Sequence, residues 1–201
     1  MSESKQVLVK LHVNGEAQSV AVAAQATLLE ALRYGFGLTG SKQGCDKGDC
    51  GACTVLARPL DLEECRVNGC SPRGEPILAC ITLAQDAQGL GLTTIEGLAG
   101  PQGLDPIQQA FADCGALQCG FCQPGMMLSA RALLDINPKP TISEIQHALS
   151  GNLCRCTGYT KIYEAIQVAA GMRSPSNAAS VRSEPAPGVS GPRLHVDEIA
   201  P

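Results

Sequence analysis

Cysteine is the residue type whose number and spacing could support chemistry in this chain. Eleven of the 201 residues are cysteines. Three of them, Cys45, Cys50 and Cys53, form a C-x4-C-x2-C pattern in a glycine-rich stretch. Thiolates are metal ligands, and glycines between them allow backbone N–H groups to turn toward the anionic sulfurs. The pattern therefore predicts a loop that binds a metal centre.

The spacing of this loop is the one that plant-type [2Fe-2S] ferredoxins use, with a fourth cysteine further along the chain. Cys65, Cys70 and Cys80 are the candidates. Cys80 lies inside the apolar run 77–83, which we expect to be a core strand that holds it in place. Cys65 and Cys70 lie in a polar stretch with Pro and Gly that is typical of an inserted loop. We expect Cys80 to be the ligand and the other two to be reduced loop thiols, because a C-x4-C clip alone is an incomplete metal site.

A second group consists of Cys119 and Cys122, joined much later by Cys154 and Cys156. Each pair precedes a predicted helix, so two helix N-termini could direct free N–H groups at one anionic centre. By spacing alone, a zinc ion held by four cysteines competes with a cluster here. The neighbouring ferredoxin-like loop favours iron and sulfide.

Other candidate ligands have simpler explanations. Cys114 completes an apolar helical face, where cysteine behaves as a small hydrophobic residue. His12, His147 and His195 have no partner at ligand spacing. The sequence has no P-loop, no GxGxxG and no Ser-His-Asp set. It therefore indicates an electron carrier without a substrate site.

The elements that must position the cysteines change character near residue 97. Before it, hydrophobic alternation and an Asn-Gly turn predict a hairpin over 6–22. A capping box of Thr27 and Glu30 opens a short helix that ends near Gly35. Three apolar runs predict further strands, at 54–57, 77–83 and 90–95. The first half is therefore mixed β with one helix.

After residue 97 the apolar period becomes helical and predicts four helices. They are a helix capped by Asp105, a helix over 126–135, a helix opened by Thr141 and closed by Gly151, and a helix over 161–170. The residues from 172 onward are rich in Ser, Pro, Ala and Gly, and they predict a tail or an arm on a partner.

Composition excludes several classes of partner. Fifteen Lys and Arg stand against 19 Asp and Glu, giving a net charge of -4, and 3% of residues are aromatic with no Trp. Nucleic-acid binding is therefore not expected. No apolar stretch is long enough for a membrane span, and the first residues do not read as a signal peptide. We expect a cytoplasmic protein whose thiols stay reduced.

With both cysteine groups placed, residues 6–171 resemble the two-[2Fe-2S] iron-sulfur subunit of the molybdenum hydroxylases, the xanthine dehydrogenase and aldehyde oxidoreductase family. The segments that carry the resemblance are GCDKGDCGACTV, TIEGL, QCGFCQPGMM and GNLCRCTGY. The resemblance implies an α+β fold: an N-terminal β-grasp plant-type ferredoxin domain, then a C-terminal four-helix-bundle [2Fe-2S] domain. The corresponding ranges are 1–97 with an insertion at about 58–75, 98–171, and a Pro/Ser-rich tail over 172–201.

The resemblance also implies a function. The chain would be a non-catalytic subunit that relays electrons from a molybdopterin-type molybdenum cofactor on a large subunit to FAD on a medium subunit, in a dimer of heterotrimers. One cluster would be held by Cys119, Cys122, Cys154 and Cys156, with Gln118 and Cys156 facing the pterin. The other would be held by Cys45, Cys50, Cys53 and Cys80. Two further cysteines and a long tail depart from the family pattern. A free two-cluster ferredoxin and a zinc-stabilised interaction module are the alternatives.

Overall fold

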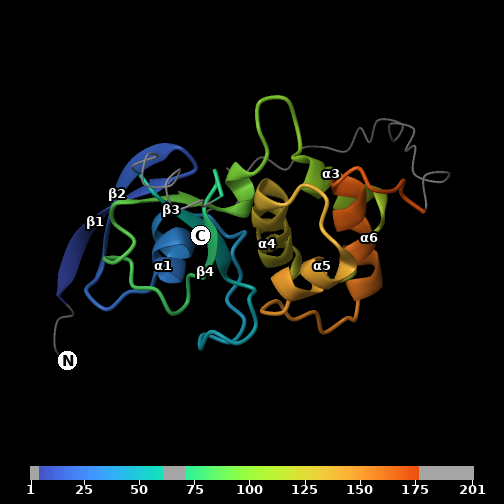
Figure 1. Cartoon of the computed structure of the whole chain (residues 1–201). Helices are drawn as coiled ribbons and strands as arrows, with labels where there is room; N and C mark the ends of the chain where they lie inside the picture. The colour runs from blue at the N-terminus through green and yellow to red at the C-terminus, as the bar shows by residue number, and fades with distance from the viewer. Residues whose placement is uncertain (1–4, 61–70, 177–201) are drawn as a thin grey trace, which may run out of the picture.

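A computed structural model of the chain describes residues 5–60 and 71–176 (Figure 1). The described chain is mixed α/β, with a sheet built from the first half and helices from the second. In Figure 1 the sheet lies on one side of the molecule and helices α3, α5 and α6 on the other, with α4 between them. No helix in the described ranges has the length and apolar character that crossing a membrane requires.

The sheet has five strands in the order β2-β1-β5-β3-β4. Strand β1 runs parallel to β5, whereas the β1–β2, β3–β5 and β3–β4 pairs are antiparallel. The strands are β1 (Gln6–Val13), β2 (Glu16–Ala23), β3 (Thr54–Pro59), β4 (Glu75–Leu78) and β5 (Leu90–Thr93). Strand β3 thus lies inside the sheet, and β4 forms one edge beside it.

Local sequence signals explain the first hairpin. Asn14 and Gly15 both have positive φ, at 54° and 89°, which suits the two-residue turn that joins β1 to β2. Along β1 the side chains of Val9, Leu11 and Val13 are buried. The alternation predicted from the sequence is therefore confirmed, and it turns one face of the sheet toward a core.

That face is covered by a short helical segment. Helix α1 (Leu28–Glu30) begins with the predicted capping box at Thr27 and continues as the π-helical turn η1 (Ala31–Gly35). Their side chains pack with those of the strands in one core, to which Leu28, Leu29 and Leu32 belong. A 3-10 turn, η2 (Ile95–Gly97), follows β5 and leads into the second half.

Four helices follow: α3 (Pro106–Asp113), α4 (Gln123–Ile136), α5 (Ile142–Ala148) and α6 (Tyr159–Ala169). The side chain of Asp105 caps α3, and Thr141 caps α5, as the sequence predicts. Their buried faces form a second core that includes Phe111, Met126 and Ile166.

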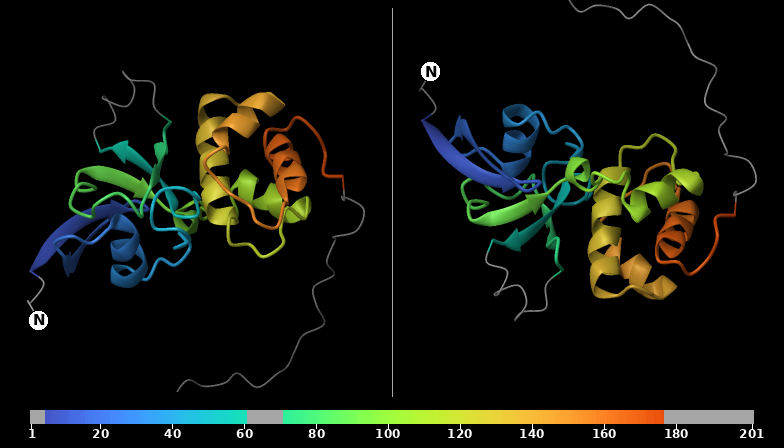
Figure 2. Two further views of the ribbon diagram at one scale, coloured as in Figure 1. Left: turned by 90° about the horizontal axis from the view of Figure 1, so that it is seen from below. Right: turned by 90° about the horizontal axis from the view of Figure 1, so that it is seen from above.

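The two halves pack against each other through α4, which contacts β3 and β4 (Figure 2). Beside this contact, Asp135 of α4 accepts hydrogen bonds from Arg73 Nη1 at 2.9 Å and from Ser71 Oγ at 3.0 Å. Arg131 Nη2 lies 2.8 Å from the same carboxylate, and Arg73 and Arg131 both approach Asp105 at 3.6 Å. The ion pairs therefore join the segment before β4 to two helices.

The strand predicted at 77–83 is shorter than expected. The apolar run 77–83 contributes only its first residues to β4, which ends at Leu78. The chain then turns, because Ile81 N–H bonds back to the Leu78 carbonyl at 3.2 Å. Cys80 therefore lies in a buried turn after the strand and not in its middle.

Candidate iron-sulfur sites

The first cysteine group lies in the loop before β3 and in the turn after β4. Because β3 and β4 pair with Thr54 opposite Leu78, Cys53, one position before this ladder, is brought close to Cys80, two positions after it. Ala79 N–H bonds to the Cys53 carbonyl at 3.4 Å. Both side chains are buried, whereas Cys45 and Cys50 are partly exposed. The sheet register thus connects cysteines that are 27 positions apart in the sequence.

These four thiols interact as two pairs. The Cys50 thiol is hydrogen-bonded to Cys45, and the Cys53 thiol is hydrogen-bonded to Cys80. The charge on Cys50 also raises the pKa of Cys53, so the two pairs interact electrostatically. Two pairs of thiols are the ligand set of a [2Fe-2S] cluster, in which each of two irons takes two thiolates.

The loop gives its thiols different acidities. N–H groups of Lys47, Asp49 and Cys50 point at the Cys45 sulfur and lower the pKa of this thiol from 9.0 to about 7. The Asp49 N–H lies 3.3 Å from that sulfur. Burial raises the pKa of Cys53 to about 12. The Cys45 thiol therefore ionises near neutral pH. The Cys53 thiol stays protonated at that pH unless a metal ion binds its sulfur.

Backbone conformation turns those N–H groups inward. Gly48 and Gly51 have φ of 85° and 70°, and Asp46 has φ of 53° although it carries a side chain. Such a left-handed residue is uncommon outside glycine and costs energy. It stands directly after a cysteine, where the loop must bend around its sulfur.

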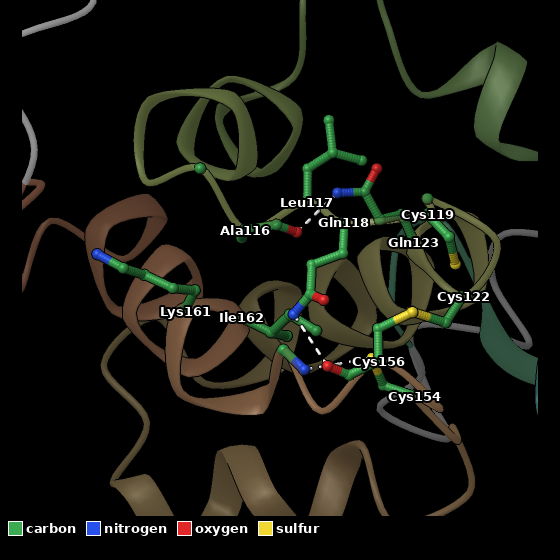
Figure 3. Close-up of a pocket in the computed structure, with 13 residues that line it drawn as sticks. Ala116, Leu117, Gln118, Cys119, Cys122, Gln123, Cys154, Cys156, Lys161 and Ile162 are labelled. Carbon is green, nitrogen blue, oxygen red and sulfur yellow. Dashed lines mark hydrogen bonds between the residues drawn. The ribbon is translucent and has the colours of Figure 1, made fainter.

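The second group lies at the start of α4 and before α6. Cys122 is the N-cap residue of α4, and Gly158 is that of α6, so α4 begins three residues and α6 two residues before the starts predicted at 126 and 161. Figure 3 shows the side chains of Cys119, Cys122, Cys154 and Cys156 gathered on one side of a pocket. Both helices therefore direct their N-terminal ends toward the same group of sulfurs.

These thiols also form two pairs. The Cys156 thiol is hydrogen-bonded to Cys119, and the Cys122 thiol to Cys154. The Phe121 N–H, and after it the Cys156 thiol, lower the pKa of Cys119. Burial raises the pKa of Cys122 to about 12. The contrast between an outer and an inner thiol in the first group is repeated here.

The backbone around this second group is also bent. Gly158 N–H lies 3.4 Å from the Cys154 sulfur, and Thr157, which follows Cys156, has φ of 58°. A β-branched residue in this region is an outlier. Each group therefore has one strained non-glycine residue directly after a cysteine.

Gln118 lies at the mouth of the second site. Its Nε2 donates to the Cys156 carbonyl at 2.9 Å, and the side chain is exposed (Figure 3). Together with Leu117, Lys161 and the cysteines it lines a cavity of about 50 Å³. The Gln118 side-chain amide therefore links the segment that carries Cys119 to the segment that carries Cys156.

The two groups are neighbours. An open pocket of about 400 Å³ is lined by Cys45 and Cys50 from the first and by Cys154 from the second, with Phe121 among the residues between them. The Leu153 N–H donates to the Cys50 carbonyl at 2.9 Å. Leu153, which directly precedes Cys154 of the second group, is thus hydrogen-bonded to Cys50 of the first group.

The remaining candidates fall outside these groups. Cys114 is buried at the end of α3 in the helical core, as the sequence predicts. Cys65, Cys70 and His195 lie outside the described residues. Within residues 5–60 and 71–176, no three His, Cys, Asp or Glu side chains surround one point as a single metal ion requires. The paired arrangement of the eight thiols fits two-iron clusters.

Two residues of the junction between the groups were missed in the sequence. Asn152 is buried and bonds to the first loop, and Tyr159 bonds to the backbone on both sides of Leu153. The partners of Asn152 in the first loop are about 100 positions away. No local pattern could reveal such contacts.

Two family models match the two halves of the chain. Residues 11–85 match the family described as "2Fe-2S iron-sulfur cluster binding domain", and residues 94–167 match "[2Fe-2S] binding domain". The first match contains Cys45, Cys50, Cys53 and Cys80, and the second contains the other four.

Relatives match along most of their length. The chain is 45% identical over 163 residues to the nicotinate dehydrogenase small FeS subunit of Eubacterium barkeri, covering 81% of this chain and 94% of that one. It is 45% identical over 170 residues to the nicotine 6-hydroxylase small subunit of Paenarthrobacter nicotinovorans, covering 85% and 93%.

A solved structure gives the same result. A chain of quinoline 2-oxidoreductase from Pseudomonas putida 86 superposes with a TM-score of 0.73 at 39% identity, over 84% of this chain and 96% of that one. Sequence and fold thus agree over nearly the whole length of these relatives. The chain belongs to the [2Fe-2S] small subunits of the molybdenum hydroxylase family, and it is an oxidoreductase subunit.

Proposed function

We propose that this chain is the electron-transfer subunit of a multisubunit molybdenum hydroxylase, passing electrons from a molybdopterin centre on a large subunit to FAD on a medium subunit. The observation that carries the proposal is the direct contact between two groups of four paired thiols, through the bond from Leu153 N–H to the Cys50 carbonyl. A [2Fe-2S] cluster supplies reversible one-electron chemistry at each group.

The ligands follow from the pairs. Cys45 and Cys50 would bind one iron of the first cluster, and Cys53 and Cys80 the other. Cys119 and Cys156, and Cys122 and Cys154, would do the same for the second. N–H groups aimed at Cys45 and Cys119 stabilise the negative charge on these sulfurs. We assign the sheet half to a β-grasp ferredoxin domain and the helical half to a four-helix [2Fe-2S] domain.

The second group would face the large subunit. Gln118 and Cys156 are expected to contact the pterin, which is supported by the exposure of Gln118 and by its bond to the Cys156 carbonyl. Exposed apolar side chains surround this group, namely Leu117, Phe121 and Leu153. Such side chains at the rim are suited to burial against a partner. The chain itself would perform no substrate chemistry.

The assembly is proposed to be a dimer of heterotrimers in the cytoplasm. The eight cysteines of the two sites must stay reduced in order to bind iron, a state that a reducing compartment maintains. The named relatives are small subunits, as their descriptions state, which supports larger partners for this chain.

The first test is the metal content of the complex purified anaerobically, together with low-temperature EPR after dithionite reduction. About four irons and four sulfides per chain, with two distinct S = 1/2 signals, are expected from two [2Fe-2S] centres. Larger subunits that carry molybdenum and flavin should copurify. Zinc in place of iron would return the chain to a structural module, and a chain that is monomeric in native extract would contradict the complex.

A further inference from the structure

The junction between the two cysteine groups contains a buried side chain with no place in the ligand sets. Asn152 is 5% exposed and lies two residues before Cys154. Its Nδ2 donates to the Gly51 carbonyl at 3.1 Å and approaches Thr54 Oγ1 at 3.4 Å. Gly51 follows Cys50 directly. One amide therefore holds the backbone between the ligands of the first site from a position beside the second.

The orientation of this amide is fixed. Ser129 Oγ of α4 donates to Asn152 Oδ1 at 2.9 Å, so that Nδ2 faces the first loop. Burial makes each of these bonds important, because an unpaired polar group away from water is costly. Asn152 thus connects the first loop, α4 and the segment that leads into the second site.

The backbone of this segment is held as well. The Tyr159 hydroxyl donates to the Asn152 carbonyl at 3.0 Å and accepts from Cys154 N–H at 2.9 Å. Leu153 stands between these two anchors, and its own N–H donates to the Cys50 carbonyl at 2.9 Å. The position of that N–H is therefore set from both sides.

Two glycines allow the close approach. A Cβ added to Gly51 would collide with the Gly151 carbonyl and with Asn152, and one added to Gly125 would collide with the Gly51 carbonyl. The loop, α4 and the segment around Asn152 are thus in backbone contact. A shift of any of them changes the Cys50–Leu153 bond.

We propose that Asn152 is a positioning residue for electron transfer between the two cluster sites, because it holds the Leu153–Cys50 hydrogen bond and so the path from Cys154 to Cys50. This inference rests on the function proposed above. The step moves one electron: the centre at the second site is oxidised, the centre at the first site is reduced by the same electron, and no proton or bond changes place.

The path itself is short. From the Cys154 ligand it runs along one peptide to Leu153, across one hydrogen bond, and to the carbonyl of the Cys50 ligand. Asn152 is not part of this path, because its side chain bonds to Gly51, Thr54 and Ser129. Its effect is to keep the donor and acceptor of the bond in line.

The test compares Asn152→Ala with Asn137→Ala in the full chain within its complex. Asn137 is a partly exposed asparagine after α4 that bonds to Glu144, and it lies 15 or more positions from any of the eight thiols in the sequence. Iron and sulfide are counted first. The magnetic interaction between the two centres is then measured by EPR of the fully reduced protein, and the electron redistribution between them is timed after a rapid one-electron pulse.

We expect Asn152→Ala to keep both clusters, to lose most of the splitting that the interaction produces, and to redistribute the electron several-fold more slowly. Asn137→Ala should match the unmodified protein in each measurement. Ser129→Ala leaves Asn152 in place but frees its amide to turn, and it should show a smaller effect in the same direction. This variant replaces Asn152→Ala in the test if Asn152→Ala fails to fold.

Three results are distinguishable. Unchanged splitting and unchanged timing in a fully loaded Asn152→Ala or Ser129→Ala protein would overturn the positioning role. Absence of iron from the unmodified protein would instead contradict the proposed function. A uniform loss of stability with intact magnetic interaction would show that Asn152 is only structural, and would also overturn the inference.

Discussion

The cysteines of each group differ in what surrounds their sulfur. The outer thiols Cys45 and Cys119 receive backbone N–H groups, and these lower their pKa. Of the inner thiols, Cys53 is buried and Cys122 is partly buried, and the loss of contact with water raises the pKa of both to about 12. Because a thiolate and not a thiol binds metal, the inner cysteines must lose their protons when they bind iron.

This difference predicts a pH profile. In the apo chain, the rate at which iodoacetamide alkylates Cys45 should rise with pH and reach half its maximum near pH 7, because the thiolate forms as the pH passes the lowered pKa of about 7. Peptide mapping by mass spectrometry measures the rate at each site. Cys53, with its pKa raised to about 12, is the internal control and should stay unmodified at neutral pH. Equal labelling of both would contradict the assignment.

The fourth ligand of the first site gives a second prediction. Cys80→Ser should remove the ferredoxin-type cluster and leave the other, so iron falls by about half, because each [2Fe-2S] centre holds two irons. Cys65→Ser and Cys70→Ser are the matched controls and should keep the full iron content. EPR identifies which signal is lost. Retention of both signals in Cys80→Ser would show that another residue is the ligand.

At the level of helices and loops, glycine sets how closely the two cysteine groups approach. In Gly125→Ala the new methyl would collide with the Gly51 carbonyl. We expect the apo chain to lose about 1–3 kcal/mol in its free energy of unfolding, the usual effect of overpacking. Urea denaturation measures this loss.

Gly100→Ala is the control, because a Cβ there has no neighbour within 4 Å and the residue has no positive φ. It should unfold like the unmodified chain. A Gly125→Ala chain as stable as this control would show that α4 can move away from the loop without penalty.

Local signals predicted most elements but not their junction. The capping boxes at Thr27 and Thr141 and the Asn14-Gly15 turn act between near neighbours, so the sequence alone reveals them. The run around Cys80 was predicted as a strand and is a turn after Leu78, because its length is set by pairing with β3. Asn152 could not be found, since its bonds to Gly51 and Thr54 span about 100 residues.

Across the whole molecule, a buried carboxylate ties the sheet half to the helices. The side chain of Asp135 is 6% exposed and bonds to Arg73, Arg131 and Ser71. Asp135→Asn removes one negative charge from this network and leaves Arg73 and Arg131 with Asp105, at 3.6 Å from each, as their remaining carboxylate. We expect a loss of about 2–3 kcal/mol in the free energy of unfolding, below the full effect of breaking a buried pair because Arg73 is partly exposed.

Thermal or urea unfolding of the apo chain measures this effect. Asp113→Asn is the matched control: Asp113 is exposed at the end of α3 and accepts one bond from Gln109, so its loss should change little. If both variants unfold alike, the network contributes nothing to the contact between the halves.

The hydrophobic interior does not follow the division suggested by the two family matches. Leu56 lies in β3, in the first half of the chain, yet its fully buried side chain packs in the helical core with Ile107 and Met126. A helical fragment produced alone would have a hole where this leucine stands, and a sheet fragment would expose it to water. Cutting the chain near residue 97 therefore yields two pieces of sequence, neither of which keeps a complete interior of its own.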